Sequence, residues 1–302
     1  MRVPLLALLV ALAPLAAAQS ADVERSVVVG GVKRTYLLHL PAGRASASGL
    51  PLVVVYHGGG GNGRNAARMS GMDAKADRAG FVVAYPNGTG PALANALLTW
   101  NAWLCCGTAL DRRADDVGFT RAMVEAIARD QGIDRRRVYA TGMSNGAMMA
   151  YRVACEAADV FAAIAPVAGA QDTDDCRPSA PVSVIAFHGT ADHHVKYDGG
   201  APDVSLDRHP RADKSVATTI AFWAWRDRCA TPPARSRNGH VLHETYTCES
   251  SRTGVELYAI DGQGHAWPGG TAGLRAGNVD LPTTEISATD LMWDFFARHP
   301  KP

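Results

Sequence analysis

The sequence has 302 residues, 47% of them hydrophobic, and its 30 basic residues nearly balance its 29 acidic ones. A chain of this size can bury one large core, so we expect a single domain. The formal net charge of +1 and the lack of a basic cluster argue against nucleic acid as a partner. No repeat, low-complexity tract or Ser/Thr/Pro-rich linker indicates a second module.

Residues 1–18 predict a secretory signal peptide. Arg2 precedes an apolar run over residues 5–15, and small residues occupy positions 16–18, where cleavage is expected. The run is too short to span a bilayer, and no Cys follows the cleavage site to carry a lipid. The alternative is a buried N-terminal helix. We expect residues 19–302 to form one soluble domain that is exported to the periplasm or the medium and makes no membrane contact.

Strands and helices alternate along this domain. A hairpin over residues 27–40 turns at Gly30 and Gly31, and residues 52–56 form a continuous apolar strand, which is typical of a sheet covered on both faces. Further strands are expected at 81–85, 137–141, 182–187 and 255–260, and helices at 69–78, 117–129, 147–155, 215–226 and 287–298. This alternation predicts an α/β fold with a doubly wound, mostly parallel sheet, whose active-site loops lie at the carboxyl ends of the strands.

Two polar segments are expected at the surface. Residues 111–116 alternate acidic and basic side chains ahead of a predicted helix, so we interpret them as a solvated approach with Asp116 as the N-cap. Residues 231–240 hold two prolines and predict a loop.

A glycine-rich loop follows the strand at residues 52–56, with the sequence His57-Gly58-Gly59-Gly60-Gly61-Asn62-Gly63. It matches the dinucleotide pattern G-x-G-x-x-G, but no acidic residue ends the next strand, and an exported protein meets little nicotinamide cofactor. A phosphate-binding P-loop would need a Gly-Lys-Ser/Thr that is missing here. The remaining interpretations are a flexible loop or an oxyanion hole, in which the N–H groups of Gly59 and Asn145 stabilise negative charge.

The segment Gly142-Met143-Ser144-Asn145-Gly146 lies between a β-prone run and a helix-prone run. A Ser at such a turn is exposed at the edge of the sheet, and the flanking glycines avoid clashes where strand and helix pack closely. The pattern predicts a nucleophile elbow with Ser144 as the nucleophile.

An acid and a histidine follow two later strands. Asp192 ends the segment after residues 182–187, and His265 ends the segment after residues 255–260. Ser, Asp and His in this chain order are typical of α/β-hydrolases, where the imidazole activates the Ser and the carboxylate orients the imidazole. His193 and His194 follow Asp192 too closely to replace His265, so we expect them at the rim of the site. A zinc role for them lacks a spaced third ligand.

Six cysteines suit an oxidising compartment. They allow fifteen pairings, of which we favour the local ones, Cys155 with Cys176 and Cys229 with Cys248. Each closes a loop of about twenty residues and contributes about 3 kcal/mol in the chain-entropy model. Cys105 and Cys106 are left, and a bond between these neighbours is an open alternative to two free thiols. No C-x-x-C indicates a metal site.

Several motifs together resemble one family. They are the His57-Gly58-Gly59 loop, Trp100-Asn101 followed by Cys106, Asp115-Asp116-Val117-Gly118-Phe119, the Ser144 segment, His188-Gly189-Thr190-Ala191-Asp192, and Gly264-His265-Ala266-Trp267-Pro268-Gly269-Gly270. In this order they are similar to secreted esterases of the polyhydroxybutyrate depolymerase-like and feruloyl esterase-like group. The resemblance spans about residues 27–299. It implies an α/β-hydrolase fold, with Ser144 as nucleophile, His265 as general base and acid, and Asp192 as its orienting carboxylate.

The chain departs from this group in two places, which bear on the acyl pocket. A Pro is usual where His193 stands, and many members carry a Cys or Ala after His57-Gly58. We expect Trp267, His57 and Tyr197 to border the substrate, with Trp267 as an aromatic wall; a core role is the alternative for Trp267.

The sequence therefore predicts a secreted serine carboxylesterase that works through an acyl-enzyme and needs neither metal nor cofactor. Its substrates are expected to be feruloyl esters, short-chain acyl esters or hydroxyalkanoate oligomers, cleaved faster than crystalline polymer because no binding module is apparent. One alternative is an extracellular polyhydroxybutyrate depolymerase. An alternative of another class is a non-catalytic binding protein on a hydrolase scaffold.

Overall fold

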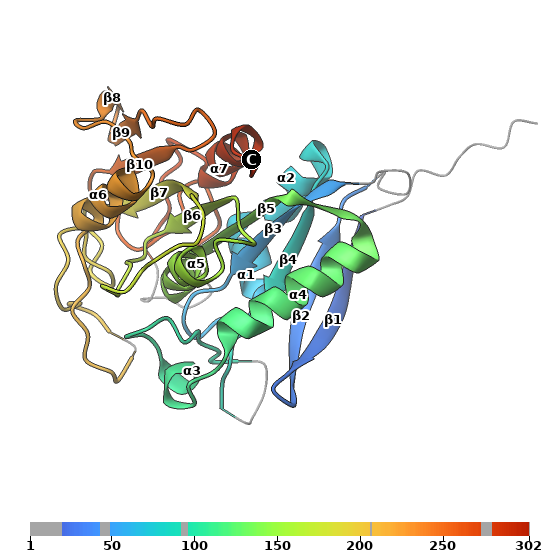
Figure 1. Ribbon diagram of the computed structural model, residues 1–302. Coiled ribbons are helices and arrows are strands. Elements are labelled where there is room, and N and C mark those ends of the chain that lie inside the picture. Colours follow the sequence, from blue (N-terminus) through green and yellow to red (C-terminus); the bar gives the residue numbers. More distant parts are fainter. Residues whose placement is uncertain (1–19, 43–48, 92–95, 206, 273–279, 302) are drawn as a thin grey trace, which may run out of the picture.

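The computed structural model describes residues 20–42, 49–91, 96–205, 207–272 and 280–301. Within these residues, ten strands form one sheet in the order β1-β2-β4-β3-β5-β6-β7-β10-β9-β8 (Figure 1). The six central strands from β4 to β10 run parallel, and antiparallel strands extend both edges. The strands are β1 (Ala21–Val29), β2 (Val32–Leu40), β3 (Leu50–Tyr56), β4 (Val82–Pro86), β5 (Ile133–Met143), β6 (Ala163–Val167), β7 (Ser183–Gly189), β8 (Ala234–Asn238), β9 (Val241–Tyr246) and β10 (Val255–Ile260).

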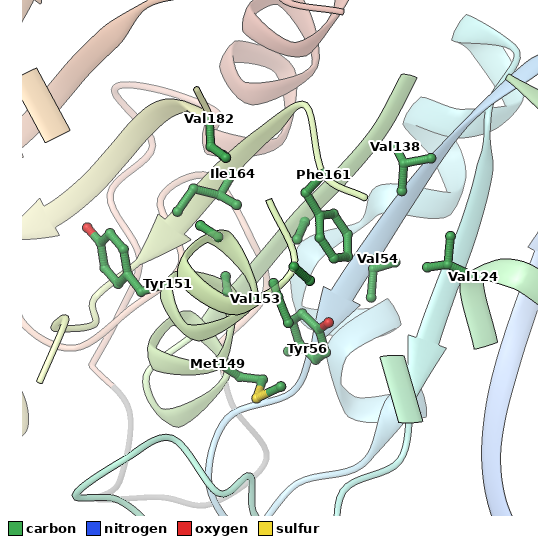
Figure 2. Close-up of a cluster of buried hydrophobic side chains, with 14 of the residues drawn as sticks. Val54, Tyr56, Val124, Val138, Met149, Tyr151, Val153, Phe161, Ile164 and Val182 are labelled. Atoms are coloured by element: carbon green, nitrogen blue, oxygen red, sulfur yellow. The ribbon is translucent and has the colours of Figure 1, made fainter. Parts of the chain in front are cut away.

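Helices cover both faces of the sheet because the central strands are apolar on both sides. Along β3, Leu52, Val54 and Tyr56 enter one core cluster, whereas Val53 and Val55 enter another. The first cluster packs against α4 (Asp116–Gln131), α5 (Asn145–Glu156) and α6 (Val216–Arg226), and Figure 2 shows part of it. The second packs against α1 (Gly63–Ser70), α2 (Met72–Ala79) and α7 (Ala288–Arg298); a short helix, α3 (Gly107–Asp111), completes the set. The predicted doubly wound, mostly parallel sheet is confirmed.

The helix predicted over residues 69–78 is wrong in its bounds. The chain forms two helices, α1 and α2, which meet at Gly71 with a left-handed φ of 61°. The helical run starts earlier than expected because the side chain of Asn62 caps α1 by accepting the N–H of Asn65.

Further differences concern strands, among them β9, which no predicted strand covers. Residues 231–240 are not all loop, since β8 pairs with β9 across a turn at Gly239. The strand β8 is exposed along its length, so it lacks the apolar pattern that identifies a strand. The short strand β6 went unpredicted because it contains Pro166 and two alanines, and β1 begins six residues before the expected hairpin.

The interpretation of Asp116 as a solvated N-cap is also wrong. Asp115 caps α4 by accepting the N–H of Gly118 at 2.8 Å. Asp116 is buried, where it accepts a hydrogen bond from Arg34 at 2.7 Å and another from the N–H of Asn101 at 2.8 Å. Its carboxylate thus ties the first hairpin to the segment that precedes α3.

Both predicted disulfides are present. Cys155 is bonded to Cys176 and Cys229 to Cys248, with Cα–Cα distances of 5.0 and 3.6 Å. Cys105 and Cys106 form the third disulfide. The predicted signal peptide, residues 1–18, lies outside the described residues. Among the described helices, none is long and apolar enough to cross a membrane.

Candidate active site

The residues predicted for catalysis follow neighbouring strands at one edge of the sheet. Tyr56, which ends β3, lies opposite Gly142 near the end of β5, so the glycine-rich loop adjoins the Ser144 turn. Gly189 at the end of β7 pairs with Ile260 at the end of β10, so the segments that carry Asp192 and His265 lie side by side. Parallel strands therefore bring four segments, far apart in sequence, to one place.

Ser144 stands on a sharp turn between β5 and α5. Its φ of 59° and ψ of −126° are costly for a residue with a side chain, on the order of 1–3 kcal/mol. The turn packs so tightly that a Cβ on Gly142 would lie 2.6 Å from the carbonyl oxygen of Gly146, and one on Gly146 would lie 2.4 Å from that of Tyr56. Only glycine fits these two positions, which is the reason for the G-x-S-x-G pattern.

Asp192 and His265 form a buried pair. The Nδ1 of His265 lies 2.7 Å from Oδ2 of Asp192, and both side chains are at least nine-tenths buried. Since the carboxylate accepts, His265 carries its proton on Nδ1 and leaves Nε2 free to accept one. The other oxygen of Asp192 accepts the N–H groups of His194 and Val195 at 2.8 and 2.9 Å.

The ionised form of Asp192 is strongly favoured. Burial by itself would raise the pKa of Asp192, but hydrogen bonds from the His188 and His265 rings outweigh burial and hold that pKa far below its usual value. The His188 ring lies 3.5 Å from the carboxylate and donates to the carbonyl of Val195 at 2.8 Å. Asp192 is therefore a fixed negative charge behind His265 at any pH near neutrality.

The glycine-rich loop is held by His57. Its Nδ1 donates to the carbonyl of Gly58 at 2.8 Å, and its Nε2 accepts the N–H of Gly88 at 3.0 Å. Burial, partly offset by the bond to Gly58, lowers the pKa of His57 to about 4, so the ring is neutral at pH 7. His57 thus joins the glycine-rich loop to the segment that follows β4, and it also lines the cavity described below.

Two N–H groups near Ser144 are without acceptors among the described residues. In the loop, the N–H of Gly60 donates to Leu98 and that of Gly61 to Gly58, whereas the N–H of Gly59 has no such partner. The N–H of Asn145, in the first turn of α5, is likewise unpaired. A Cβ on Gly59 would lie 3.8 Å from that of Asn145, so the two residues are neighbours.

The Asn145 side chain has a role that the sequence did not predict. Its amide oxygen accepts the N–H of Trp100 at 2.7 Å, and its amide nitrogen donates to the carbonyl of Trp100 at 3.0 Å. The Trp100 indole then donates to the carbonyl of His57 at 2.9 Å, and the two rings lie 4.8 Å apart. Asn145 thus fastens the glycine-rich loop to the nucleophile turn through Trp100.

A cavity of about 660 Å³ opens over these residues. Ser144 and His265 line it together with His57, Gly59 and Asn145, and we call these residues the catalytic wall. A second set of lining residues, which we call the loop wall, comes from residues 96–111 and 207–211. The loop wall presents apolar, sulfur-containing and charged groups to the cavity: Ala96, Leu97, Thr99, Cys105, Cys106, Gly107, Thr108, Asp207 and Arg211.

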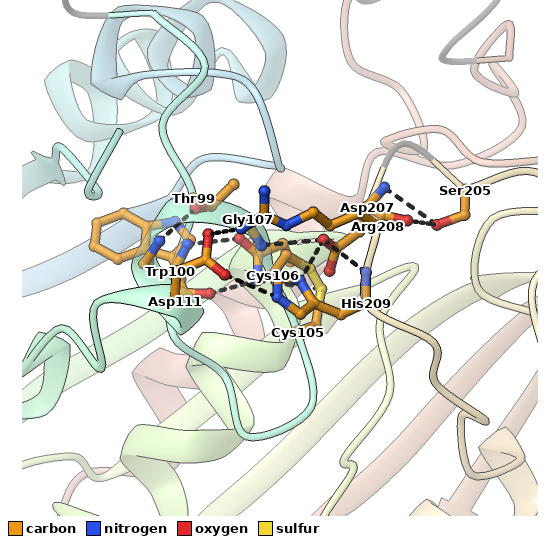
Figure 3. A network of polar contacts seen from close by, with 12 residues as sticks. Thr99, Trp100, Cys105, Cys106, Gly107, Asp111, Ser205, Asp207, Arg208 and His209 are labelled. Atoms are coloured by element: carbon orange, nitrogen blue, oxygen red, sulfur yellow. Dashed lines mark hydrogen bonds and ion pairs between the residues drawn. A yellow bond between two sulfur atoms is a disulfide. The ribbon is translucent and has the colours of Figure 1, made fainter. Parts of the chain in front are cut away.

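Polar contacts bind the two parts of the loop wall to each other (Figure 3). Asp207 accepts the N–H of Gly107 at 3.2 Å and contacts Nδ1 of His209 at 2.8 Å. The Nε2 of His209 in turn contacts Asp111 at 3.0 Å, and Arg208 pairs with the same carboxylate. Residues a hundred positions apart are therefore fixed as one surface of the cavity that Ser144 also lines.

Two residues predicted to border the substrate lie elsewhere. Trp267 is buried in the second core cluster, and its indole donates to Thr289 at 3.0 Å, so the core alternative holds and the predicted aromatic wall is wrong. Tyr197 packs against the first core cluster, 5.9 Å from the His188 ring, and is absent from the cavity lining. Both closely follow residues predicted to be catalytic, but their side chains do not line the cavity.

Residues 34–192 match the family described as esterase PHB depolymerase. The protein belongs to this esterase family. Its predicted resemblance is thereby confirmed, and the esterase is a carboxylic ester hydrolase by family. The matched region includes the glycine-rich loop and Ser144 and ends at Asp192.

Three named relatives are similar in sequence to this esterase. It is 33% identical to "Putative esterase NocK" of Nocardia uniformis subsp. tsuyamanensis, over 92% of this chain and 83% of the relative. It is 30% identical to feruloyl esterase B of Piromyces equi, over 80% of this chain and 44% of the relative. It is 28% identical to poly(3-hydroxyalkanoate) depolymerase C of Paucimonas lemoignei, over 76% of this chain and 58% of the relative. This esterase thus spans only about half the length of the last two proteins.

A solved structure shows the same fold. Acetyl xylan esterase from Aspergillus awamori superimposes with a TM-score of 0.60 over 91% of this chain and 99% of that one, at 17% identity. At this identity the likeness concerns the fold alone. The esterase has the α/β-hydrolase fold, as predicted.

Proposed function

We propose that this protein is an exported serine esterase that hydrolyses carboxylic esters through an acyl-enzyme. The observation that carries the proposal is the buried Asp192–His265 pair at 2.7 Å, in one cavity with a Ser144 held at a strained turn. A fixed carboxylate, a singly protonated imidazole and a raised Ser are the parts that acyl transfer requires. Three disulfides support an oxidising compartment.

In the first half of the reaction, Ser144 Oγ attacks the ester carbonyl while Nε2 of His265 takes its proton. The carbonyl oxygen becomes negative, and the unpaired N–H groups of Gly59 and Asn145 stabilise it; one such donor is worth about 3 kcal/mol. The tetrahedral centre collapses, the C–O bond to the alcohol breaks, and His265 returns the proton to the departing oxygen. Water then attacks the acyl-Ser144 ester by the same route and releases the acid and free Ser144.

We assign short acyl, feruloyl and hydroxyalkanoate oligomer esters as the substrate class. The cavity of about 660 Å³ suits a compact ligand. Relatives whose names include feruloyl esterase and poly(3-hydroxyalkanoate) depolymerase support two of these acyl groups. The preference for aryl esters that rested on Trp267 has no basis, because Trp267 is buried in the core.

Depolymerisation of solid polyhydroxybutyrate is the second candidate, favoured by the depolymerase relative. Adsorption to a solid would rely on exposed apolar residues at the mouth of the cavity, of which Leu97 and Val204 are two. Such a small patch gives weak adsorption, so we expect soluble esters and oligomers to be cleaved much faster than granules.

The experiment is a panel of feruloyl, acetyl and 3-hydroxybutyrate esters assayed side by side with a granule suspension, using wild type and Ser144→Ala. Wild type should hydrolyse at least one soluble ester, and Ser144→Ala, with an unchanged thermal unfolding midpoint, should hydrolyse none. Hydrolysis of no ester by wild type would favour the binding-protein alternative. Granule clearing at a rate per active site similar to that on soluble esters would favour the depolymerase.

A further inference from the structure

A second imidazole lies in the cavity beside the proposed catalytic one. The ring of His194 lines the cavity with its centroid 4.8 Å from that of His265 and the planes inclined at 37°. Its backbone is fixed on both sides, because its N–H donates to Asp192 at 2.8 Å and its carbonyl accepts Arg211 at 2.8 Å. The backbone that carries the ring is therefore held whether or not the ring itself makes a bond.

The ring of His194 itself is unused. Neither of its nitrogens hydrogen-bonds to a described residue, whereas His57, His188 and His265 each have ring nitrogens engaged with protein groups. Burial, and then the neighbouring His265 imidazole, lowers the pKa of His194, so the ring is neutral near pH 7. A neutral imidazole offers one N–H donor and one acceptor, which together can bind a hydroxyl group in either direction.

The chemistry of ester cleavage fixes which part of a substrate meets His194. His265 must return its proton to the departing alcohol oxygen, so the alcohol lies against the His265 ring. His194 is in contact with that same ring. The acyl group is bonded to Ser144 and has no such requirement to lie against His265.

We propose that His194 forms a leaving-group subsite that hydrogen-bonds a free hydroxyl on the alcohol portion of the ester, so that esters of polyhydroxy alcohols such as sugars are preferred to esters of simple alkanols. This inference rests on the proposed esterase function. It concerns the alcohol half of the substrate, which the acetyl and feruloyl classes above leave open.

The surrounding charges favour a hydroxyl over a carboxylate on the alcohol. Arg211 lines the cavity next to His194, but its Nε is paired with Asp213 at 2.7 Å, and both side chains are more than nine-tenths buried. Its positive charge is therefore already compensated. Asp207 adds a carboxylate to the same cavity, which would repel an anionic alcohol.

The preceding residue provides a matched control. His193 is exposed, and its Nδ1 lies 2.9 Å from Asp203, which also pairs with Lys196 at 3.1 Å. It is absent from the cavity lining. Replacing His193 removes the same chemical group one residue away without touching the subsite.

The test compares two esters that share one acyl group, the methyl ester and the arabinose ester of ferulic acid, on wild type, His194→Ala, His194→Gln and His193→Ala. We expect kcat/KM on the sugar ester to fall about 5- to 10-fold in His194→Ala, the size of one hydrogen bond, with the methyl ester changed less than twofold. His194→Gln, which keeps a donor and an acceptor, should recover most of the loss, and His193→Ala should match wild type. Thermal unfolding checks that each variant is folded.

Equal losses on both esters in His194→Ala, or no loss on either, would overturn the subsite. A loss that Gln fails to recover would also contradict it. If wild type hydrolyses neither this pair nor the matching acetyl pair, the proposed esterase function fails first, which is a distinct result.

Discussion

The catalytic wall and the loop wall of the cavity are built in different ways. The catalytic wall comes from turns that follow β3, β5 and β10, with Asp192 after β7 behind His265, so the sheet register fixes its spacing. The loop wall comes from two segments about a hundred residues apart, joined by polar contacts centred on Asp207 and His209. We propose that the catalytic wall carries the bond-breaking chemistry and that the loop wall, together with His194, selects the substrate, as is common when active-site loops sit on a fixed scaffold.

The largest effect should come from Asp192→Asn, which removes the negative charge but keeps the shape. We expect kcat to fall by about 10³- to 10⁴-fold, because His265 loses the carboxylate that sets its tautomer and stabilises its charged form. The measurement is kcat on the best soluble ester. Asp203→Asn, which alters an exposed carboxylate, should leave kcat unchanged. A kcat within tenfold of wild type in Asp192→Asn would contradict the assignment of His265 as a general base that Asp192 orients.

The next effect tests the clamp between the glycine-rich loop and the nucleophile turn. Asn145→Ala removes both side-chain bonds to Trp100 but keeps the N–H. We expect kcat to fall about 10- to 100-fold with KM changed less, because the loop N–H groups move from their positions around the oxyanion. Asn238→Ala, on the exposed strand β8, is the control. An unchanged kcat would mean that the loop holds its place without Asn145.

The catalytic wall was largely predictable from sequence, and the reason is local. Ser144, Asp192 and His265 each follow an apolar strand and stand beside glycines, so short-range patterns identify them. Trp100 and Asn145 were present in recognisable motifs, but their mutual hydrogen bonds depend on contacts across 45 residues. Trp267 was misassigned because adjacency to His265 in sequence does not determine the direction of a side chain.

The loop wall was not predictable. It depends on contacts such as Asp207 with Gly107 and His209 with Asp111, which no periodic pattern encodes. Similarly, Asp116 in a charged run looked solvated, whereas its partner Arg34 in β2 lies 82 residues away. Prediction rules based on neighbouring residues do not detect polar pairs between residues that are far apart in sequence.

A smaller effect, on KM and not on kcat, is expected from a change confined to the loop wall. Asp207→Ala removes the acceptor of Gly107 and His209 from the loop wall. We expect KM to rise several-fold while kcat stays within about twofold, since binding is altered and proton transfer is not. Steady-state kinetics on one soluble ester measure both. A hundredfold loss in kcat would show that the loop wall takes part in the chemistry.

The smallest expected effect is on the free energy of unfolding. It involves Asp172, whose neighbour Asp213 pairs with Arg211 of the loop wall. Burial, and next the neighbouring carboxylate of Asp213, raises the pKa of Asp172 to about 7. A carboxyl with a raised folded pKa contributes stability that is complete below about pH 4 and is lost as pH rises through about 7. Wild type should therefore lose stability between pH 5 and pH 8.

Asn at position 172 is neutral at every pH, so Asp172→Asn should lose less stability than wild type as the pH rises. At pH 8 we expect the variant to unfold at a higher temperature, with a free energy of unfolding larger by an amount on the order of 2 kcal/mol. Calorimetry at pH 5 and pH 8 measures it. Asp198→Asn, an exposed acid, controls for net charge. Parallel slopes for wild type and Asp172→Asn would mean that the pair does not govern this pH range.

The most direct test of the whole account is covalent labelling with an organophosphate, followed by peptide mass spectrometry. The phosphorus reagent reacts with an activated Ser in the geometry of acyl transfer, so it reports the nucleophile without any assumption about substrate. We expect one adduct per chain, on Ser144, formed in step with loss of esterase activity and absent from Ser144→Ala. An adduct on another residue, or ester hydrolysis that persists in a folded Ser144→Ala, would contradict the assignment of Ser144.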